Sequence, residues 1–99
     1  NRQLTLEEKD IIGTYENRGS YTYRYVLLEN GIAKYLKSID GTTTDLKWSI
    51  VDNELHIVWA NGGVHVWKLN PDNSITIIAH ILKGQRTDYP KRETFKKIK

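Results

Sequence analysis

The sequence of 99 residues contains no cysteine and no methionine, and only two prolines and one phenylalanine. Without cysteine the chain has no disulfide, no thiolate metal site and no thiol chemistry, which leaves its compartment open. No apolar run approaches the roughly 18 residues of a membrane-spanning helix. Because methionine is missing even at position 1, we expect a processed or truncated product, for instance one that has lost an N-terminal signal segment.

Motifs that carry chemistry are missing as well. No Ser/His/Asp set and no pair of carboxylates can be proposed, and Asp40, Asp52 and Asp72 stand in turns, where hydrogen bonding to the backbone explains them. We therefore expect no enzyme, no cofactor and no metal. The alternation described below places His65 inside and His56 and His80 outside, so the three histidines are not expected to share a metal ion.

The composition fits one domain spanning residues 1–99. Apolar content is 38% and mean hydropathy is −0.58, which predicts a small core rich in aromatic residues. Charge is uneven, because residues 83–99 carry seven basic and two acidic groups. This basic end indicates either contact with an acidic partner or a solvated edge strand that lysines protect from aggregation.

Residues 46–82 alternate apolar and polar side chains with period two, which predicts strands and not a helix. Turn sequences divide the stretch at Asp52-Asn53, at residues 61–63 and at Pro71-Asp72-Asn73. We expect these pairs on the inner face: Ile50 with Leu55, Trp48 with Ile57, Leu46 with Trp59, Leu69 with Ile75, Trp67 with Ile77, and His65 with Ala79.

The turn Asn61-Gly62-Gly63 decides which side chains face inward, because a one-residue slip reverses a strand's two faces. A two-residue loop would put Lys68 on the same face as Leu55 and Ile57. A three-residue loop with a left-handed glycine keeps Lys68 outside, so we predict that loop. It pairs Leu55 with Leu69, Ile57 with Trp67, and Trp59 with His65.

The rest of the chain extends this meander. Further strands are expected at residues 11–16, 20–29, 32–38 and 93–98, and residues 86–90 are expected to be a connection. The loop at residues 29–31 has two or three residues, and the favoured three-residue loop pairs Tyr25 with Tyr35 and Leu27 with Ala33. A capping-box pattern predicts a short helix over about residues 6–10. The fold class is all-β: an antiparallel up-and-down barrel of about eight strands, or a strongly curled meander, with a short N-terminal helix. We expect the first and last strands to pair, with Tyr15 meeting Phe95 at that junction.

A short helix followed by Gly13-Thr14-Tyr15 and then by hairpins resembles the lipocalin-like (calycin) barrels, which begin with a short helix and a Gly-x-Trp motif. It is also similar to small lipocalin-like domains of bacterial secreted proteins and lipoproteins. The resemblance implies a binding or structural barrel without catalysis, a small apolar ligand, and an extracytoplasmic location that is secreted, periplasmic or lipid-anchored. Tyr15 stands in place of the tryptophan.

The inner face contains one ionisable side chain, His65, beside two tryptophans. This pattern is typical of a polar group inside an otherwise apolar ligand pocket, and more often of a core histidine with a tyrosine or water partner. Tyrosines on residues 20–38 either stack a ligand or form a half-buried core. The expected ligand-binding residues are Trp59, His65, Trp67, Tyr23 and Tyr25.

Two alternatives come from other classes of function. The outer face of the meander is expected to expose an apolar row that serves protein interaction or dimerisation. Its residues are Val58, Val66, Ile78 and His80. The tyrosines near the basic C-terminus indicate, as a further alternative, binding of single-stranded nucleic acid.

Overall fold

The computed structural model describes residues 10–19, 21–37 and 40–99, which form nine strands and their turns. The strands are β1 (Gly13–Arg18), β2 (Thr22–Leu27), β3 (Ile32–Lys37), β4 (Thr43–Val51), β5 (Glu54–Val58), β6 (Val64–Leu69), β7 (Ile75–Leu82), β8 (Gln85–Asp88) and β9 (Thr94–Lys97). The helix expected over about residues 6–10 lies outside the described residues apart from Asp10. No helix in the described ranges has the length and hydropathy to cross a membrane.

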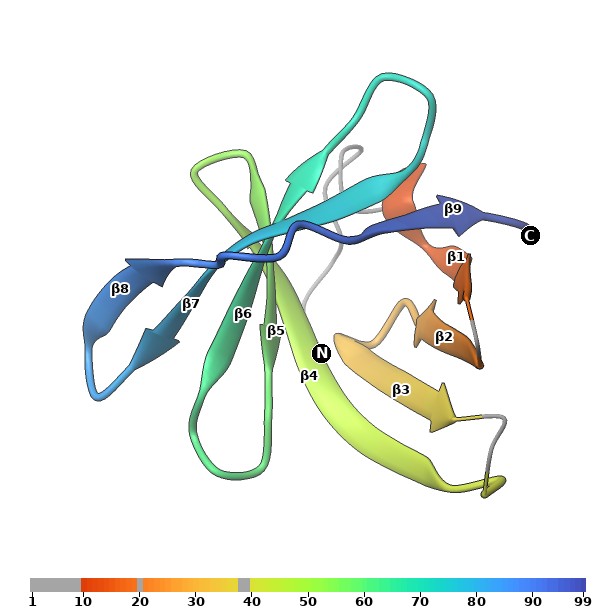
Figure 1. The fold of residues 1–99 in the computed structure, drawn as a ribbon, viewed down its shortest axis with the longest axis horizontal. Coiled ribbons are helices and arrows are strands. Elements are labelled where there is room, and N and C mark those ends of the chain that lie inside the picture. Colours follow the sequence, from red (N-terminus) through yellow and green to blue (C-terminus); the bar gives the residue numbers. More distant parts are fainter. Residues whose placement is uncertain (1–9, 20, 38–39) are drawn as a thin grey trace.

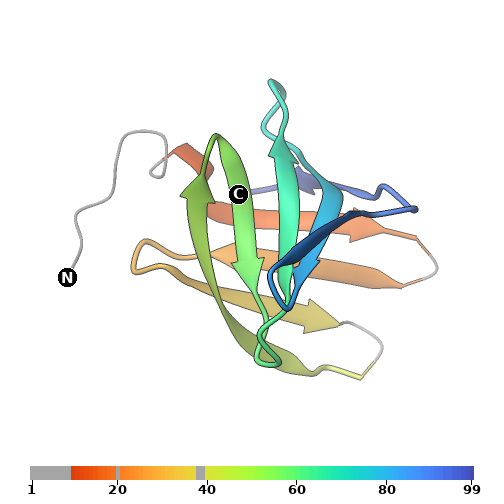
Figure 2. The same ribbon diagram turned by 90° about the vertical axis from the view of Figure 1, so that its left-hand side faces the viewer.

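Eight of these strands close into an antiparallel barrel. Strands β1 to β7 follow one another around the sheet, β7 pairs with β9, and β9 pairs with β1. Figure 1 shows β9 beside β1, and Figure 2 shows strands β1–β3 running across the direction of β5–β7. The predicted all-β barrel of about eight strands is therefore confirmed.

The junction of β1 and β9 depends on Gly13. Its φ is +150°, and an added Cβ would lie 2.3 Å from the Lys99 carbonyl oxygen. Across the junction, Ile98 N–H donates to the Thr14 carbonyl at 2.8 Å. Tyr15 and Phe95 both lie in the core cluster, but the residue directly opposite Tyr15 is Lys97. Only glycine allows β1 to approach the C-terminal residues this closely.

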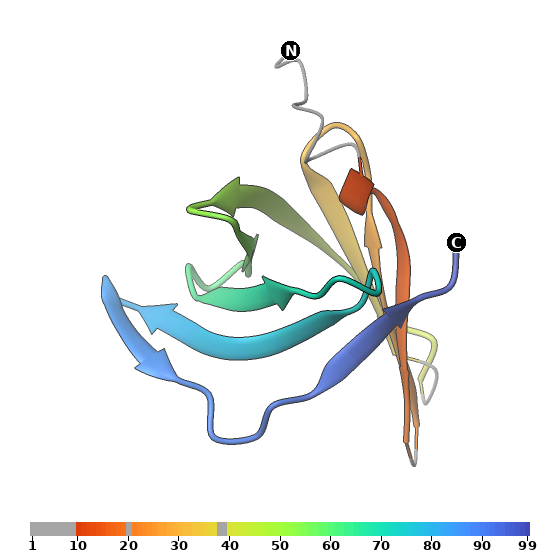
Figure 3. The same cartoon turned by 90° about the horizontal axis from the view of Figure 1, so that it is seen from above.

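The ninth strand, β8, was not expected. It pairs with residues 79–82 of β7, while Ile75 and Thr76 at the start of β7 pair with β9. Lys83 and Gly84, with φ of +52° and +79°, form the turn that joins β7 to β8. In Figure 3 this hairpin projects from one side of the strongly curved sheet. The basic strand β9 is paired on both sides and is not an edge, whereas β8, which pairs only with β7 among the described strands and is exposed along its length, is the solvated edge strand of this basic end.

Most hairpin registers agree with the turn chemistry. Asp52 and Asn53 have φ of +51° and +65°, and the predicted pairs Ile50–Leu55 and Trp48–Ile57 form around them. Several further pairs are confirmed: Leu69 with Ile75, Trp67 with Ile77, Tyr25 with Tyr35, and Leu27 with Ala33. The ladder of β4 with β5 ends at Lys47 and Val58, so the expected pair of Leu46 with Trp59 is not part of it.

The register of β5 with β6 differs by two residues from the prediction. Ile57 lies opposite His65, and Leu55 lies opposite Trp67. The turn closes earlier than expected, because Trp59 N–H donates to the Gly63 carbonyl at 2.8 Å. A shift of two residues keeps every side chain on its face, so the expected inward set survives the wrong register.

A β-bulge between β6 and β7 changes the outer part of the barrel wall. Beyond the pair of Trp67 with Ile77, Val66 lies opposite Ala79 and His65 lies opposite His80, so Ile78 is the extra residue. The predicted pair of His65 with Ala79 is therefore wrong. The bulge also turns His80 to the same face as His65, where the alternation had placed it outside.

Candidate functional site

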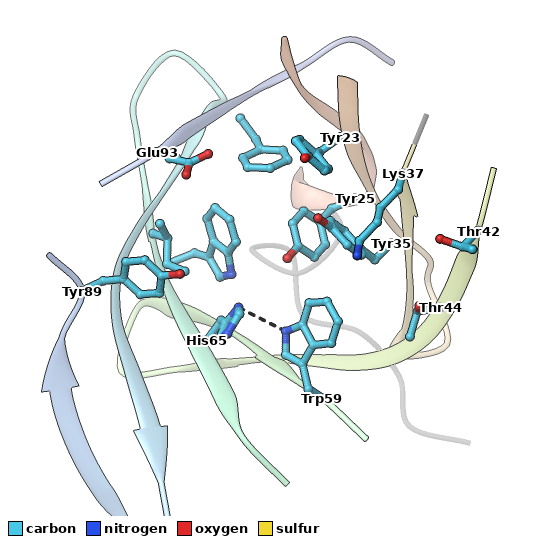
Figure 4. Close-up of a pocket in the computed structure, with 13 residues that line it drawn as sticks. Tyr23, Tyr25, Tyr35, Lys37, Thr42, Thr44, Trp59, His65, Tyr89 and Glu93 are labelled. Carbon is cyan, nitrogen blue, oxygen red and sulfur yellow. Dashed lines mark hydrogen bonds between the residues drawn. The ribbon is translucent and has the colours of Figure 1, made fainter. Parts of the chain in front are cut away.

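A cavity of about 440 Å³ lies in the barrel interior and opens to solvent. It is lined by side chains from six strands and the connections beside them: Tyr23, Tyr25, Tyr35, Lys37, Thr42, Thr44, Trp59, His65, Trp67, Ile77, Tyr89, Glu93 and Phe95. Figure 4 shows ten of these labelled around the space. All five residues expected to bind a ligand line this one cavity.

The lining forms a continuous aromatic network. The ring centroid of Tyr25 lies 4.8 Å from that of Tyr35 and 5.2 Å from that of Trp67. Tyr35 in turn lies 5.2 Å from Trp59, and Trp67 lies 5.3 Å from Phe95. Most of these contacts are edge-to-face, the geometry that aromatic quadrupoles favour. The walls that a ligand would meet are therefore held in place by one another.

His65 is fixed by Trp59. The Trp59 Nε1–H donates a hydrogen bond of 3.1 Å to His65 Nδ1, drawn as the dashed line in Figure 4. Burial, and secondly the charge of His80, lower the pKa of His65 below its usual 6.5. A neutral imidazole that accepts at Nδ1 carries its proton on Nε2. At neutral pH, His65 therefore offers one N–H donor.

This arrangement predicts how stability depends on pH. Because the pKa of His65 is lower in the folded state, the unfolded chain binds the proton first as pH falls. The contribution of neutral His65 is thus fully present above about pH 6.5 and is lost as pH falls toward its folded pKa. We expect denaturant unfolding to show falling stability between neutral and mildly acidic pH. His65→Asn retains an acceptor for Trp59 and should reduce that slope.

All other ionisable groups are shared by the two proteins, so the difference between wild type and His65→Asn isolates His65. Equal slopes would contradict the assignment of a destabilising proton to His65.

The hydroxyls of Tyr25 and Tyr35 stay protonated at neutral pH. Burial is the first cause of a raised pKa at Tyr25 and at Tyr35, and the charge of Glu93 contributes to both. A protonated hydroxyl both donates and accepts hydrogen bonds. The cavity therefore combines aromatic surface with neutral polar groups.

The two charged side chains of the lining stand apart. Lys37 ends β3 on one wall, while Glu93 precedes β9 on the other, and Figure 4 shows them on opposite sides of the aromatic residues. Glu93 is half-buried and Lys37 is exposed. Backbone hydrogen bonds hold the side of the cavity that carries Glu93. Ile77 N–H donates to the Glu93 carbonyl at 3.0 Å, and Tyr89 N–H donates to the Ile78 carbonyl at 2.9 Å.

A second cavity of about 460 Å³ lies on the other side of Tyr89. It shares Trp59, His65 and Tyr89 with the first cavity, so these three side chains form the boundary between the two. The Tyr89 ring makes edge-to-face contacts with both His65 and His80, at 6.1 and 5.8 Å between centroids. The boundary is thus a layer of rings.

The pair His65 and His80 is not a ready metal site, although the bulge brings both to one face. A metal needs an unprotonated ring nitrogen, while His65 uses Nδ1 to accept from Trp59 and carries a proton on Nε2. No three His, Cys, Asp or Glu side chains within the described ranges are arranged to hold a metal ion. The earlier reason for rejecting a shared metal, opposite faces, is wrong for His80.

The outer apolar row expected to form an interface is not exposed at its centre. Val66 is fully buried, Val58 and Ile78 are half-buried, and His80 faces the second cavity. Arg86 on β8 also bonds both carboxylate oxygens of Glu54 on β5, at 2.8 and 3.0 Å, which ties β8 to β5 across two strands. The row therefore offers less surface to a partner than the alternation indicated.

Sequence reasoning missed several lining residues. Tyr35 could have been found, because its expected partner was Tyr25, a residue assigned to the site. Tyr89 could not, because it lies in a connection whose path no periodicity sets, and Glu93 had been placed in the expected last strand, whereas β9 begins at Thr94. Lys37 and Phe95 had been assigned to strands without a link to the cavity. Tyr21 is exposed while Tyr25 is buried, so the tyrosines do not form one open stacking surface.

Comparisons with family models, with curated proteins and with solved structures find no match to this chain. The closed antiparallel barrel is compatible with a calycin-like architecture. The relation to lipocalins therefore stands as a resemblance of fold.

Proposed function

We propose that the barrel binds a small organic molecule in the cavity bounded by Trp59, His65 and Trp67, without catalysing a reaction. The observation that carries this proposal is the cavity itself, since about 440 Å³ falls within the usual range of ligand pockets. A barrel of this size whose own side chains filled it would leave no such space. The five residues expected to bind a ligand all border it.

The lining favours an amphipathic ligand over a purely apolar one. The faces and edges of Tyr25, Tyr35 and Trp59 offer aromatic contact. His65 offers an N–H donor, and the tyrosine hydroxyls donate or accept. A ligand with a flat aromatic body and a few polar atoms at its edge satisfies both parts of the wall.

The test uses the three indole N–H signals in heteronuclear NMR, recorded while phenol, indole or benzyl alcohol is added. Trp59 and Trp67 line the cavity, whereas Trp48 donates its Nε1–H to the Leu28 carbonyl at 2.8 Å and is not part of the lining. We expect saturable shifts of the Trp59 and Trp67 signals with little change at Trp48.

Trp48 is the internal control, and assignments come from single Trp→Phe variants. Shifts of all three signals together would indicate nonspecific binding. No saturable shift of Trp59 or Trp67 with any of the three compounds would overturn the proposal.

A further inference from the structure

Among the residues that the structure describes, Glu93 is the only acidic side chain that lines the cavity of about 440 Å³. It is half-buried, and none of the ion pairs formed among the described residues includes it. The other half-buried or buried carboxylates, Glu16 and Glu54, each bond one or two arginines. Glu93 thus stands at a cavity wall without the cation that the comparable carboxylates have.

The charge of Glu93 acts on the cavity interior. It contributes to the raised pKa of both Tyr25 and Tyr35, which lie on β2 and β3. The field of the carboxylate therefore reaches the tyrosines on the facing strands. A positive charge placed between them would be stabilised by that field, because little water screens a partly enclosed site.

The aromatic rings add to this preference. Tyrosine and tryptophan faces attract a cation within about 6 Å of the ring centroid. Tyr23 and Tyr35 stack with centroids 6.2 Å apart, and Tyr35 continues to Trp59. Electron-rich rings beside one carboxylate are the chemistry that recognises ammonium and quaternary ammonium groups.

Lys37 influences how a charged ligand is oriented in the cavity. It lies on the wall opposite Glu93 and is exposed (Figure 4). Repulsion by its ammonium group disfavours a cation on its own side of the cavity. The two charges together place a positive group near Glu93 and leave the Lys37 side for neutral or negative atoms.

We propose that the ligand of this barrel carries a cationic group, an ammonium or quaternary ammonium, held between the Glu93 carboxylate and the tyrosine rings. This inference rests on the proposed function and names the charge class of its ligand. It assigns Glu93 to cation binding and Lys37 to the orientation of the ligand.

The test compares two probes of nearly equal shape, benzyltrimethylammonium and its neutral isostere neopentylbenzene. Binding is measured from the Trp59 and Trp67 indole shifts of the whole chain. We expect the cation to bind about tenfold more tightly than the isostere. Glu93→Gln should remove most of that preference by weakening the binding of the cation, with a much smaller effect on the isostere.

Lys37→Gln is the matched control, since it removes a charge from the same cavity, and it should preserve or increase the preference for the cation. Glu93→Gln keeps the backbone carbonyl that accepts from Ile77, so its folding is checked by an unchanged Trp48 signal and unfolding midpoint. Equal affinity for both probes, or a preference that survives Glu93→Gln, would overturn this inference alone. Failure of both probes to bind, together with the neutral aromatic panel, would overturn the proposed function as well.

Discussion

Val66→Asp is expected to lower the free energy of unfolding by about 3 kcal/mol or more, because it buries a carboxylate. Val66 is 0% exposed, and Ala79, directly opposite on β7, is also 0% exposed. The pattern of residues 46–82 had placed Val66 on an open outer face, where the same change would cost little. Urea denaturation monitored by tryptophan fluorescence measures the difference.

Val51→Asp is the control. Val51 is a valine at the end of β4, which β5 separates from β6, and it is 42% exposed, so the same substitution should change stability by no more than about 0.5 kcal/mol. Similar small costs at both positions would mean that Val66 is exposed and that the outer row is open to a partner. A large cost at Val66 alone would confirm the buried arrangement around the bulge.

The bulge explains why the sequence located the inner face better than the outer one. Periodicity assigns a side chain to the correct face of the sheet as long as the strand is regular, as for Trp48, Ile57 and Trp67. The extra residue Ile78 moves every later side chain of β7, including His80, to the opposite face of the sheet from the one predicted. Nothing in the local sequence from Ile75 to Ile78 marks that position, since these four residues are all β-branched and good strand formers.

Turn chemistry was the more reliable signal where it was specific. Asp52-Asn53 and Asn73 adopt the left-handed conformation, and the predicted register holds next to both turns, in the second hairpin as far as the bulge between Trp67 and Val66. Residues 61–63 offered several glycine positions for that conformation, and there the register was wrong by two. A turn therefore fixes a register when its sequence allows positive φ at only one set of positions.

The parts of the site that could not be predicted depend on tertiary closure. β8 has the sequence Gln-Arg-Thr-Asp and is exposed along its length, so no apolar alternation identifies it as a strand. Its pairing with the end of β7 brings Tyr89 to His65 and directs the following residues, Glu93 included, to the cavity wall. Such a path is set by the closure of the barrel and not by local preference.

Trp67→Ala is expected to cost about 3–5 kcal/mol, the range for removing a large buried aromatic side chain. Trp67 is 2% exposed and packs against Tyr25 and Phe95 at 5.2 and 5.3 Å between ring centroids. Its Nε1–H is also buried without a hydrogen-bond partner in the described structure. An unpaired buried donor costs about 1–3 kcal/mol. Trp67→Phe keeps a ring and removes that donor, so the two effects should largely offset one another.

Trp48→Phe is the matched comparison, because Trp48 is 3% exposed and makes the hydrogen bond that Trp67 lacks, to the Leu28 carbonyl at 2.8 Å. Trp48→Phe removes an indole N–H that is hydrogen-bonded, and the Leu28 carbonyl loses that donor. We expect Trp48→Phe to cost about 1–2 kcal/mol more than Trp67→Phe in urea denaturation. Equal costs would contradict an unpaired indole N–H at Trp67. If Trp67→Phe is nearly neutral, the variant also leaves a folded barrel in which ligand binding can be measured without the Trp67 donor.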